Sequence, residues 1–152
     1  MERKVALITG GAKGIGRQIA LSLAENGHDI AVNYHSDKNS ADEICKTAKE
    51  NGVNALSFYA NMGNVDEIKN MVFQVDQKFG KIDVLINNAG IRKDNLMLWM
   101  TGEEWSKVLD ISLNGFFNVT QPLLKNMLVK RYGRIVNIVS LSGIQGMPGP
   151  VS

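Results

Sequence analysis

The stretch TGGAKGIG, Thr9 to Gly16, places four glycines within eight residues. An apolar run, Val5–Thr9, precedes it, and a helical pattern, Gly14–Asn26, follows it. Glycines between a strand and a helix let the backbone approach a pyrophosphate, which then lies on the free N–H groups of the helix N-terminus. A glycine cluster also suits a plain turn, and this spacing differs from G-x-G-x-x-G. The stretch therefore predicts a strand-turn-helix unit and leaves both a nucleotide site and a simple turn open.

Apolar runs and amphipathic stretches alternate along the rest of the chain. Further strands are predicted at Asp29–Tyr34, Asn54–Ala60, Ile82–Asn87 and Arg134–Ser140. Further helices are predicted at Ser40–Asn51, Val65–Phe79 and Glu103–Lys130. Nearly continuous apolar strands that alternate with helices are typical of a parallel sheet covered on both faces. We predict one α/β domain, residues 1–152, with a Rossmann-like doubly wound parallel sheet whose five strands lie in the order 3-2-1-4-5.

The composition limits the classes of partner. The net charge is only +2, which argues against nucleic acid or an anionic membrane as a partner. No apolar stretch approaches the length of a membrane span, and the apolar run near the N-terminus is shorter than a signal peptide. The single cysteine, Cys45, fits a reducing compartment. We therefore predict a cytoplasmic protein, and we predict no metal site.

The end of the second predicted strand bears on which dinucleotide the chain binds. NAD sites carry an acid about 20 residues past the glycines, which binds the ribose hydroxyls of the adenosine. The residues at this point are Asn33, Tyr34, His35 and Ser36, and the first acid is Asp37. A 2′-phosphate is not repelled by such residues, and Lys13 is able to pair with it, although a solvated lysine is the alternative. The sequence favours NADP(H) over NAD.

The fourth predicted strand runs into NNAG, Asn87–Gly90. Alone, this motif also suits a polar turn at the end of a strand. Together with TGGAKGIG it resembles the short-chain dehydrogenase/reductase family, over essentially the whole chain from Val5 to Ser152. Within that family, Asn87–Trp105 and Arg131–Gly143 are similar to bacterial 3-oxoacyl-acyl-carrier-protein reductases. That resemblance implies NADPH-dependent reduction of a 3-oxoacyl thioester to the 3-hydroxyacyl thioester, as in fatty acid synthesis.

Two alternatives to this function stay open at the level of sequence. The first is another short-chain carbonyl reductase, acting on acetoacetyl-CoA, a sugar or an aryl ketone. The second is a non-catalytic NADP-binding module.

The family resemblance also implies roles for individual residues of the cofactor site. The phosphates would lie on Gly10, Lys13, Gly14, Ile15 and Gly16. The 2′-phosphate would be bordered by Tyr34, His35 and Ser36. The adenine would be flanked by Asn61 and Met62, and the ribose near the nicotinamide by Asn88, Ala89 and Gly90.

Hydride transfer builds negative charge on the substrate oxygen, so a reductase needs a donor that polarises this oxygen and an acid that protonates it. The resemblance implies that Ser140 is the donor, with Ser142 as the alternative. Ser112 stands where the family has an asparagine of a proton relay, and it either holds a relay water or marks a lost role. Asn114, two residues further along the helix, faces the opposite side. The family's tyrosine and lysine would follow Ser152, so we expect a truncated, cofactor-binding half that is inactive alone.

Two surfaces suggest partners. The long predicted helix carries apolar residues that either cover the sheet or, as the resemblance implies, form an interface in a homodimer or homotetramer. Its basic end, with Lys130 and Arg131, either complements the helix dipole or attracts an acidic acyl carrier protein.

Overall fold

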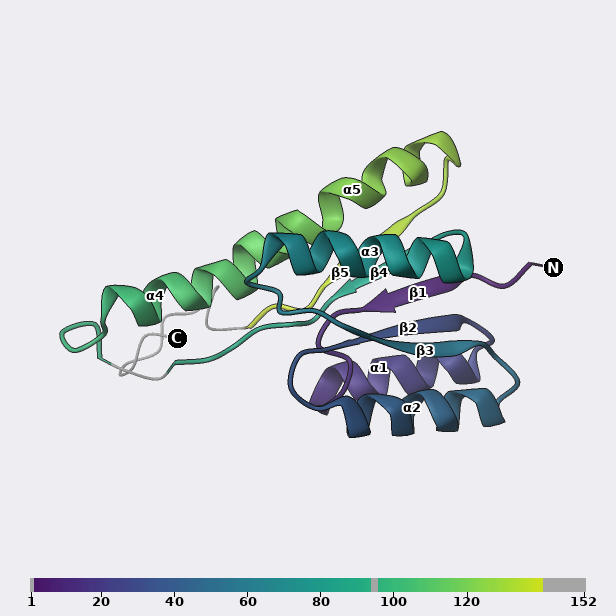
Figure 1. The fold of residues 1–152 in the computed structure, drawn as a ribbon, viewed down its shortest axis with the longest axis horizontal. Helices are drawn as coiled ribbons and strands as arrows, with labels where there is room; N and C mark the ends of the chain where they lie inside the picture. Colours follow the sequence, from purple (N-terminus) through teal and green to yellow (C-terminus); the bar gives the residue numbers. More distant parts are fainter. Residues whose placement is uncertain (1, 94–95, 141–152) are drawn as a thin grey trace.

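The computed structural model describes residues 2–93 and 96–140, and it contains one parallel sheet (Figure 1). Its strands are β1 (Val5–Ile8), β2 (Asp29–Tyr34), β3 (Ala55–Tyr59), β4 (Val84–Asn87) and β5 (Arg134–Asn137). The order across the sheet is β3-β2-β1-β4-β5, and all four pairings are parallel. The predicted fold class and strand order are confirmed.

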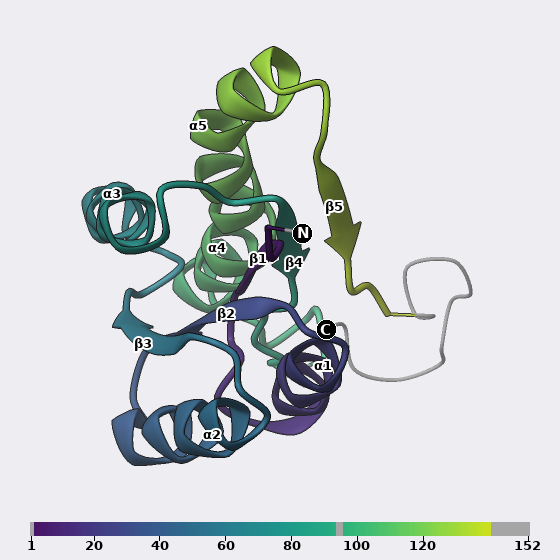
Figure 2. The same ribbon diagram turned by 90° about the vertical axis from the view of Figure 1, so that its right-hand side faces the viewer.

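Helices cover both faces of the sheet (Figure 2). On one face lie α1 (Gly14–Glu25) and α2 (Lys38–Glu50); on the other lie α3 (Val65–Phe79) and α5 (Gly115–Val129). Successive strand residues alternate between the two cores: Ile8 packs against α1 and α2, whereas Leu7 packs against α3 and α5. Burial on both faces explains why the strands are apolar without alternation.

The long predicted helix contains an irregularity that the sequence pattern did not reveal. It begins as α4 (Gly102–Leu109), passes through the π-helical turn η1 (Asp110–Asn114) and continues as α5. A capping box starts α4, since the Thr101 hydroxyl accepts from the backbone N–H of Glu104 and the Glu104 carboxylate accepts from that of Thr101. A π turn adds one residue to the helical repeat and is frequent at functional sites.

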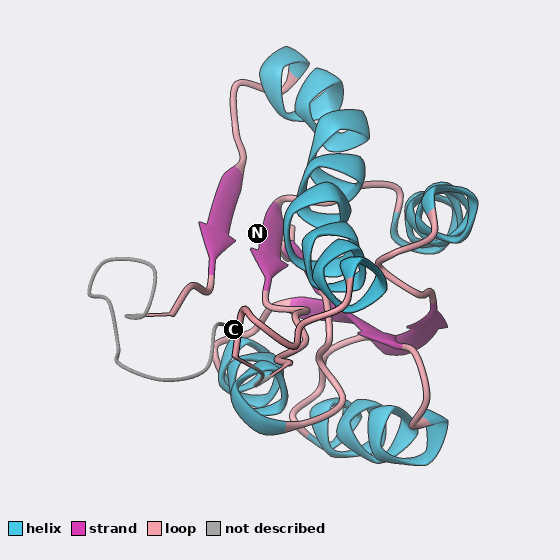
Figure 3. Cartoon of the chain, turned by 90° about the vertical axis from the view of Figure 1, so that its left-hand side faces the viewer, coloured by secondary structure: helices cyan, strands magenta, loops and turns pink. Residues whose placement is uncertain are grey.

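The β5 strand lies at one edge of the described sheet, with pairing to β4 only (Figure 3). All four of its residues are exposed. The predicted strand Arg134–Ser140 is thus shorter than expected, because regular pairing ends at Asn137.

Candidate functional site

The glycine turn after β1 is held on both sides by asparagines. The backbone N–H of Gly10 donates to Asn33 Oδ1 at 2.9 Å. The Asn88 amide donates to the carbonyl oxygens of Thr9 and Gly10, both at 3.0 Å. Gly10 has φ +60°, and a Cβ there would lie 3.0 Å from the Cα of Ala89. Glycine is required at this position both by the backbone angle and by the close approach of the β4 end.

Thr9 ties the end of β1 to the end of β4. Its Oγ1 accepts from the backbone N–H groups of Asn88 and Ala89, both at 3.0 Å, and donates to the carbonyl of Ile86 at 3.3 Å. Neither Thr9 nor Asn33 was among the sequence-predicted site residues. The pattern that indicates them is a polar residue at the carboxyl end of each of several neighbouring parallel strands, since those ends share one edge.

The N-terminus of α1 is open to an anion. Its N-cap, Lys13, makes no side-chain capping bond, and the first turn contains no acid. By contrast, side chains of Asp37, Asn64 and Thr101 cap α2, α3 and α4. A Cβ on Gly14 would meet nothing within 4 Å, so the approach to this helix end is clear. Free N–H groups at the positive end of a helix dipole fit a pyrophosphate.

Two neighbouring residues complete this turn. Ile15 is 63% exposed, although it is apolar. Gly16 packs so tightly that a Cβ would lie 2.5 Å from the carbonyl oxygen of Gly10. The predicted phosphate-binding residues therefore form one turn with an exposed outer side.

Lys13 is not a lone solvated cation. Its Nζ lies 2.9 Å from Asp37 Oδ2, although its side chain is 70% exposed. The Lys13 ammonium and the Ser40 N–H, which donates to Asp37 Oδ1 at 3.0 Å, lower the Asp37 pKa to about 2. Among the described residues, Lys13 therefore has a carboxylate partner, in addition to the phosphate predicted for it from the sequence.

The residues predicted for the adenosine lie at the end of β2 and after β2 and β3. The rings of Tyr34 and His35 each lie 6.0 Å from that of Tyr59, and Ser36 follows in the exposed turn to α2. The Asn61 backbone N–H donates to Glu67 Oε2 at 2.8 Å, and Asn61 Oδ1 accepts from the N–H of Gly63. The side chain of Met62 is buried. These contacts fix the turn after β3.

A cleft of 480 Å³ opens at the carboxyl ends of β4 and β5. Of the predicted site residues, it brings together Met62, Asn88, Ala89, Gly90, Ser112 and Ser140. Thr9, Asn87, Arg92 and Asn137 also line it, together with apolar residues of η1 and α5. The volume suits a small-molecule site. The alternative donor, Ser142, lies outside the described residues.

A polar cluster around the buried Asn87 lies beside the cleft. Asn87 Nδ2 donates to Asn137 Oδ1 at 3.0 Å and to Thr120 Oγ1 at 3.3 Å, while Asn87 Oδ1 is buried without a protein partner among the described residues. This cluster joins β4, β5 and α5 beside the cleft that the two serines line.

The π turn determines which side chains reach the cleft. Ser112, in the middle of η1, lines it. Asn114 does not; its amide donates to Asp110 Oδ1 at 2.8 Å on the exposed side. Arg92 lines the cleft just beyond the NNAG turn and was not predicted as a site residue. Its place directly after a conspicuous strand-end motif is the pattern that indicates it.

Lys130 and Arg131 lie near the amino ends of the strands, at the end of the sheet opposite to the cleft. The cleft is lined by Gly115, at the start of α5, whereas the two cations follow the end of α5 and precede Arg134, which pairs with the first residue of β4. Arg131 has φ +50°. A left-handed conformation is costly for arginine, and glycine is the usual residue at this point after a helix.

Neither a membrane-spanning helix nor a cluster of metal ligands occurs among the described residues. No described helix combines the length and apolar character needed to cross a bilayer. Across residues 2–93 and 96–140, no three or more His, Cys, Asp or Glu side chains gather as metal ligands would.

The chain is similar to known proteins in sequence. A family model described as short chain dehydrogenase matches residues 4–152. The 3-oxoacyl-[acyl-carrier-protein] reductase FabG of Staphylococcus epidermidis is 46% identical over 146 residues, which cover 96% of this chain and 60% of that protein. The FabG of Thermotoga maritima is 42% identical over 149 residues, covering 98% and 60%. The chain thus spans about 60% of the length of these relatives.

Solved structures are similar as well. The acetoin dehydrogenase YohF of Salmonella typhimurium superposes with a TM-score of 0.92 at 31% identity, covering 98% of this chain and 59% of that one. An actinorhodin polyketide ketoreductase determined with NADPH superposes with a TM-score of 0.91 at 35% identity, covering 97% and 57%.

Proposed function

Because the chain belongs to the short-chain dehydrogenase family, we propose that the protein reduces a 3-oxoacyl thioester to the 3-hydroxyacyl thioester with NADPH, and that residues 1–152 form its cofactor-binding unit. The observation that carries the proposal is the cleft, in which Ser140 and Ser112 lie beside the Asn88–Gly90 turn, next to the glycine turn of β1. The names of the FabG relatives support the thioester, and the NADPH of the ketoreductase supports a nicotinamide cofactor.

The chain's own residues suit this chemistry. The uncapped N-terminus of α1 and the exposed Gly14 would hold the pyrophosphate. Bound NADPH supplies a hydride to the carbonyl carbon. The Ser140 hydroxyl, at the cleft, would donate to the carbonyl oxygen as it gains negative charge. The proton that this oxygen finally takes would come from a tyrosine, which the family resemblance implies after Ser152.

The experiment is an NADPH oxidation assay of the full-length protein with acetoacetyl thioesters. Loss of one oxyanion donor typically lowers kcat by about 100-fold or more, so we expect this for Ser140→Ala, with unchanged affinity for NADPH. Ser142→Ala is the matched control and should keep its turnover. Full turnover of Ser140→Ala would refute the assigned role.

Ser112 is proposed to hold a relay water from its place in η1. A Ser112→Ala variant separates the two interpretations: reduced turnover supports the relay, and unchanged turnover indicates that the position has lost its role. A protein that binds NADPH but reduces no carbonyl compound would favour the non-catalytic module instead. Turnover of acetoacetyl-CoA, a sugar or an aryl ketone in preference to an acyl-carrier-protein thioester would favour the other reductase class.

An acyl carrier protein is the proposed carrier, and Arg131 is its proposed contact. The cations Lys130 and Arg131 at the C-terminal end of α5 would complement an acidic carrier protein, and the left-handed backbone of Arg131 is an outlier of the kind that accompanies functional sites. We also propose a homo-oligomer. Its supporting observation is an exposed apolar stripe at intervals of four residues along α4, η1 and α5: Leu109, Leu113 and Phe117.

A further inference from the structure

Two turns of different strands meet through one ion pair at the carboxyl edge of the sheet. Lys13 belongs to the glycine turn after β1, and Asp37 belongs to the turn between β2 and α2. Their charged atoms are 2.9 Å apart. These are the two turns between which a Rossmann-type site holds the adenosine ribose. The pair therefore lies where the 2′ position of a dinucleotide is distinguished.

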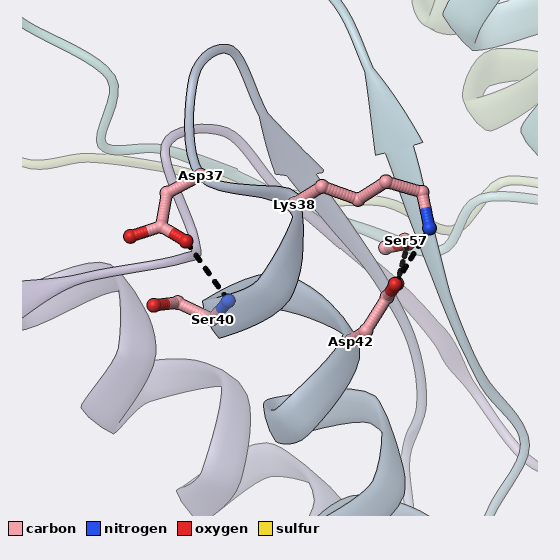
Figure 4. A network of polar contacts seen from close by, with 5 residues as sticks. All are labelled: Asp37, Lys38, Ser40, Asp42 and Ser57. Atoms are coloured by element: carbon pink, nitrogen blue, oxygen red, sulfur yellow. Dashed lines mark hydrogen bonds and ion pairs between the residues drawn. The ribbon is translucent and has the colours of Figure 1, made fainter.

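Asp37 is fixed in this position by a second contact. Its Oδ1 accepts from the Ser40 N–H at 3.0 Å and so caps α2, which leaves Oδ2 for Lys13 (Figure 4). With its pKa lowered to about 2, chiefly by the hydrogen bond from Lys13, the carboxylate is charged at every physiological pH. The acid is thus an anchored anion rather than a mobile surface charge.

The adjacent cation on α2 points elsewhere. Lys38 extends to the other side of the helix, where its Nζ lies 2.6 Å from Asp42 Oδ2 (Figure 4). The second oxygen of Asp42 accepts from the Ser57 hydroxyl of β3 at 2.5 Å. Lys38 is therefore paired with Asp42 on the side of the helix near β3, and the cation that pairs with Asp37 is Lys13.

We propose that Asp37 is a cofactor-selectivity residue that acts against a 2′-phosphate through its ion pair with Lys13. A 2′-phosphate has to draw Lys13 away from Asp37 or share it, and it also approaches a fixed carboxylate. A 2′-hydroxyl donates to Asp37 and leaves the pair in place. This inference rests on the proposed function, because it assumes a dinucleotide on the glycine turn. The preference for NADPH is accordingly smaller than Lys13 alone would give.

The test measures dissociation constants of NADPH and NADH with the full-length protein. Asp37→Asn removes the charge but keeps a side-chain oxygen that caps α2, since asparagine and aspartate are equivalent N-caps. We expect the ratio of NADPH affinity to NADH affinity to rise about fivefold in this variant, the size of one charge interaction near the surface. Lys13→Gln should lower the same ratio.

Asp42→Asn is the matched control, because Asp42 lies on the same helix and is also paired with a lysine. Its ratio should equal that of the wild type. If Asp37→Asn leaves the ratio of NADPH affinity to NADH affinity unchanged, the inference is overturned while the proposed function stands. A wild-type protein that binds neither dinucleotide would overturn the proposed function and this inference together.

Discussion

At the scale of single residues, the site depends on polar side chains whose partners are backbone groups. Asn33 and Asn88 hold the glycine turn through its N–H and C=O groups, and Thr9 holds the turn after β4. Thr9 and Asn33 are buried, and Asn88 is partly buried. Each bond satisfies a backbone group that would otherwise be unpaired within the fold. The same side chains therefore contribute both to stability and to the shape of the glycine turn.

Thr9→Val tests this contribution. Valine has nearly the same shape but leaves the N–H groups of Asn88 and Ala89 without their acceptor. An unsatisfied buried donor costs about 1–3 kcal/mol, and these two donors are partly buried, so we expect the free energy of unfolding to fall by about 2 kcal/mol. Denaturant unfolding measures it. Thr9→Ser keeps the hydroxyl and is the control; equal losses in the two variants would show that the methyl group, and not the hydrogen bonds, matters.

At the scale of elements, the end of α5 combines regular capping with an irregular residue. The N–H of Tyr132 donates to the carbonyl of Met127 and that of Arg131 to Leu128, which closes the helix through Arg131 in the left-handed conformation. The ring of Tyr132 also lies beneath Lys4, whose Nζ is 3.8 Å from its centroid. The chain reversal from α5 to β5 is thereby fixed with a costly residue at its turning point.

Arg131→Gly should stabilise the protein. Glycine adopts the left-handed angles without the Cβ clash, and we expect a gain of about 0.5–1 kcal/mol in the free energy of unfolding. If Arg131 binds a carrier protein, the same variant should lose turnover with acetoacetyl-carrier protein and keep it with acetoacetyl-CoA. Lys130→Gly is the control, because Lys130 has ordinary helical angles and gains nothing from glycine. If Arg131→Gly changes turnover of both substrates by the same factor relative to the wild type, Arg131 does not contact the carrier protein.

Sequence periodicity predicted the helices and strands but not the π turn. Apolar residues at Leu109, Leu113 and Phe117 continue the spacing of four residues through η1, so the pattern shows no interruption. The glycine turn was predictable because its composition is unusual. The partner of Lys13 was not, because Asp37 lies on another turn and only the β1–β2 pairing brings the two together. Burial of Cys45 was likewise invisible in a stretch rich in charge.

At the scale of the whole molecule, the strands of the sheet are covered unequally. The helices α1 and α2 pack over β1, β2 and β3, whereas β5 is exposed along its length. Exposed apolar residues lie on this strand and directly after it: Ile135, Val136, Ile138 and Val139. An exposed apolar edge strand favours pairing and association. Among the described residues, the β5 edge of the sheet is therefore suited to contact with further protein.

The single cysteine, Cys45, lies on the face of the sheet that α1 and α2 cover. Cys45 is a buried residue of α2 that packs into the core, and burial raises its thiol pKa to about 11. A thiol reagent at pH 8 should therefore leave the native protein unlabelled and should label one thiol after unfolding. Because the folded pKa lies above the unfolded value of 9.0, this thiol stabilises the fold below pH 9, and its contribution is lost as the pH rises through 11. Rapid labelling of the native protein at pH 8 would contradict the burial of Cys45.

The uncapped start of α1 has a consequence for the lifetime of the protein in a cell. Side chains accept hydrogen bonds from the first-turn N–H groups of α2, α3 and α4. The first turn of α1 lacks such a side chain and has N–H groups that a bound pyrophosphate would satisfy. A ligand that binds only the native state shifts the folding equilibrium in proportion to its supply. Degradation by proteases would then slow when dinucleotide is plentiful and quicken when it is scarce, so the abundance of the protein would follow the supply of dinucleotide in the cell.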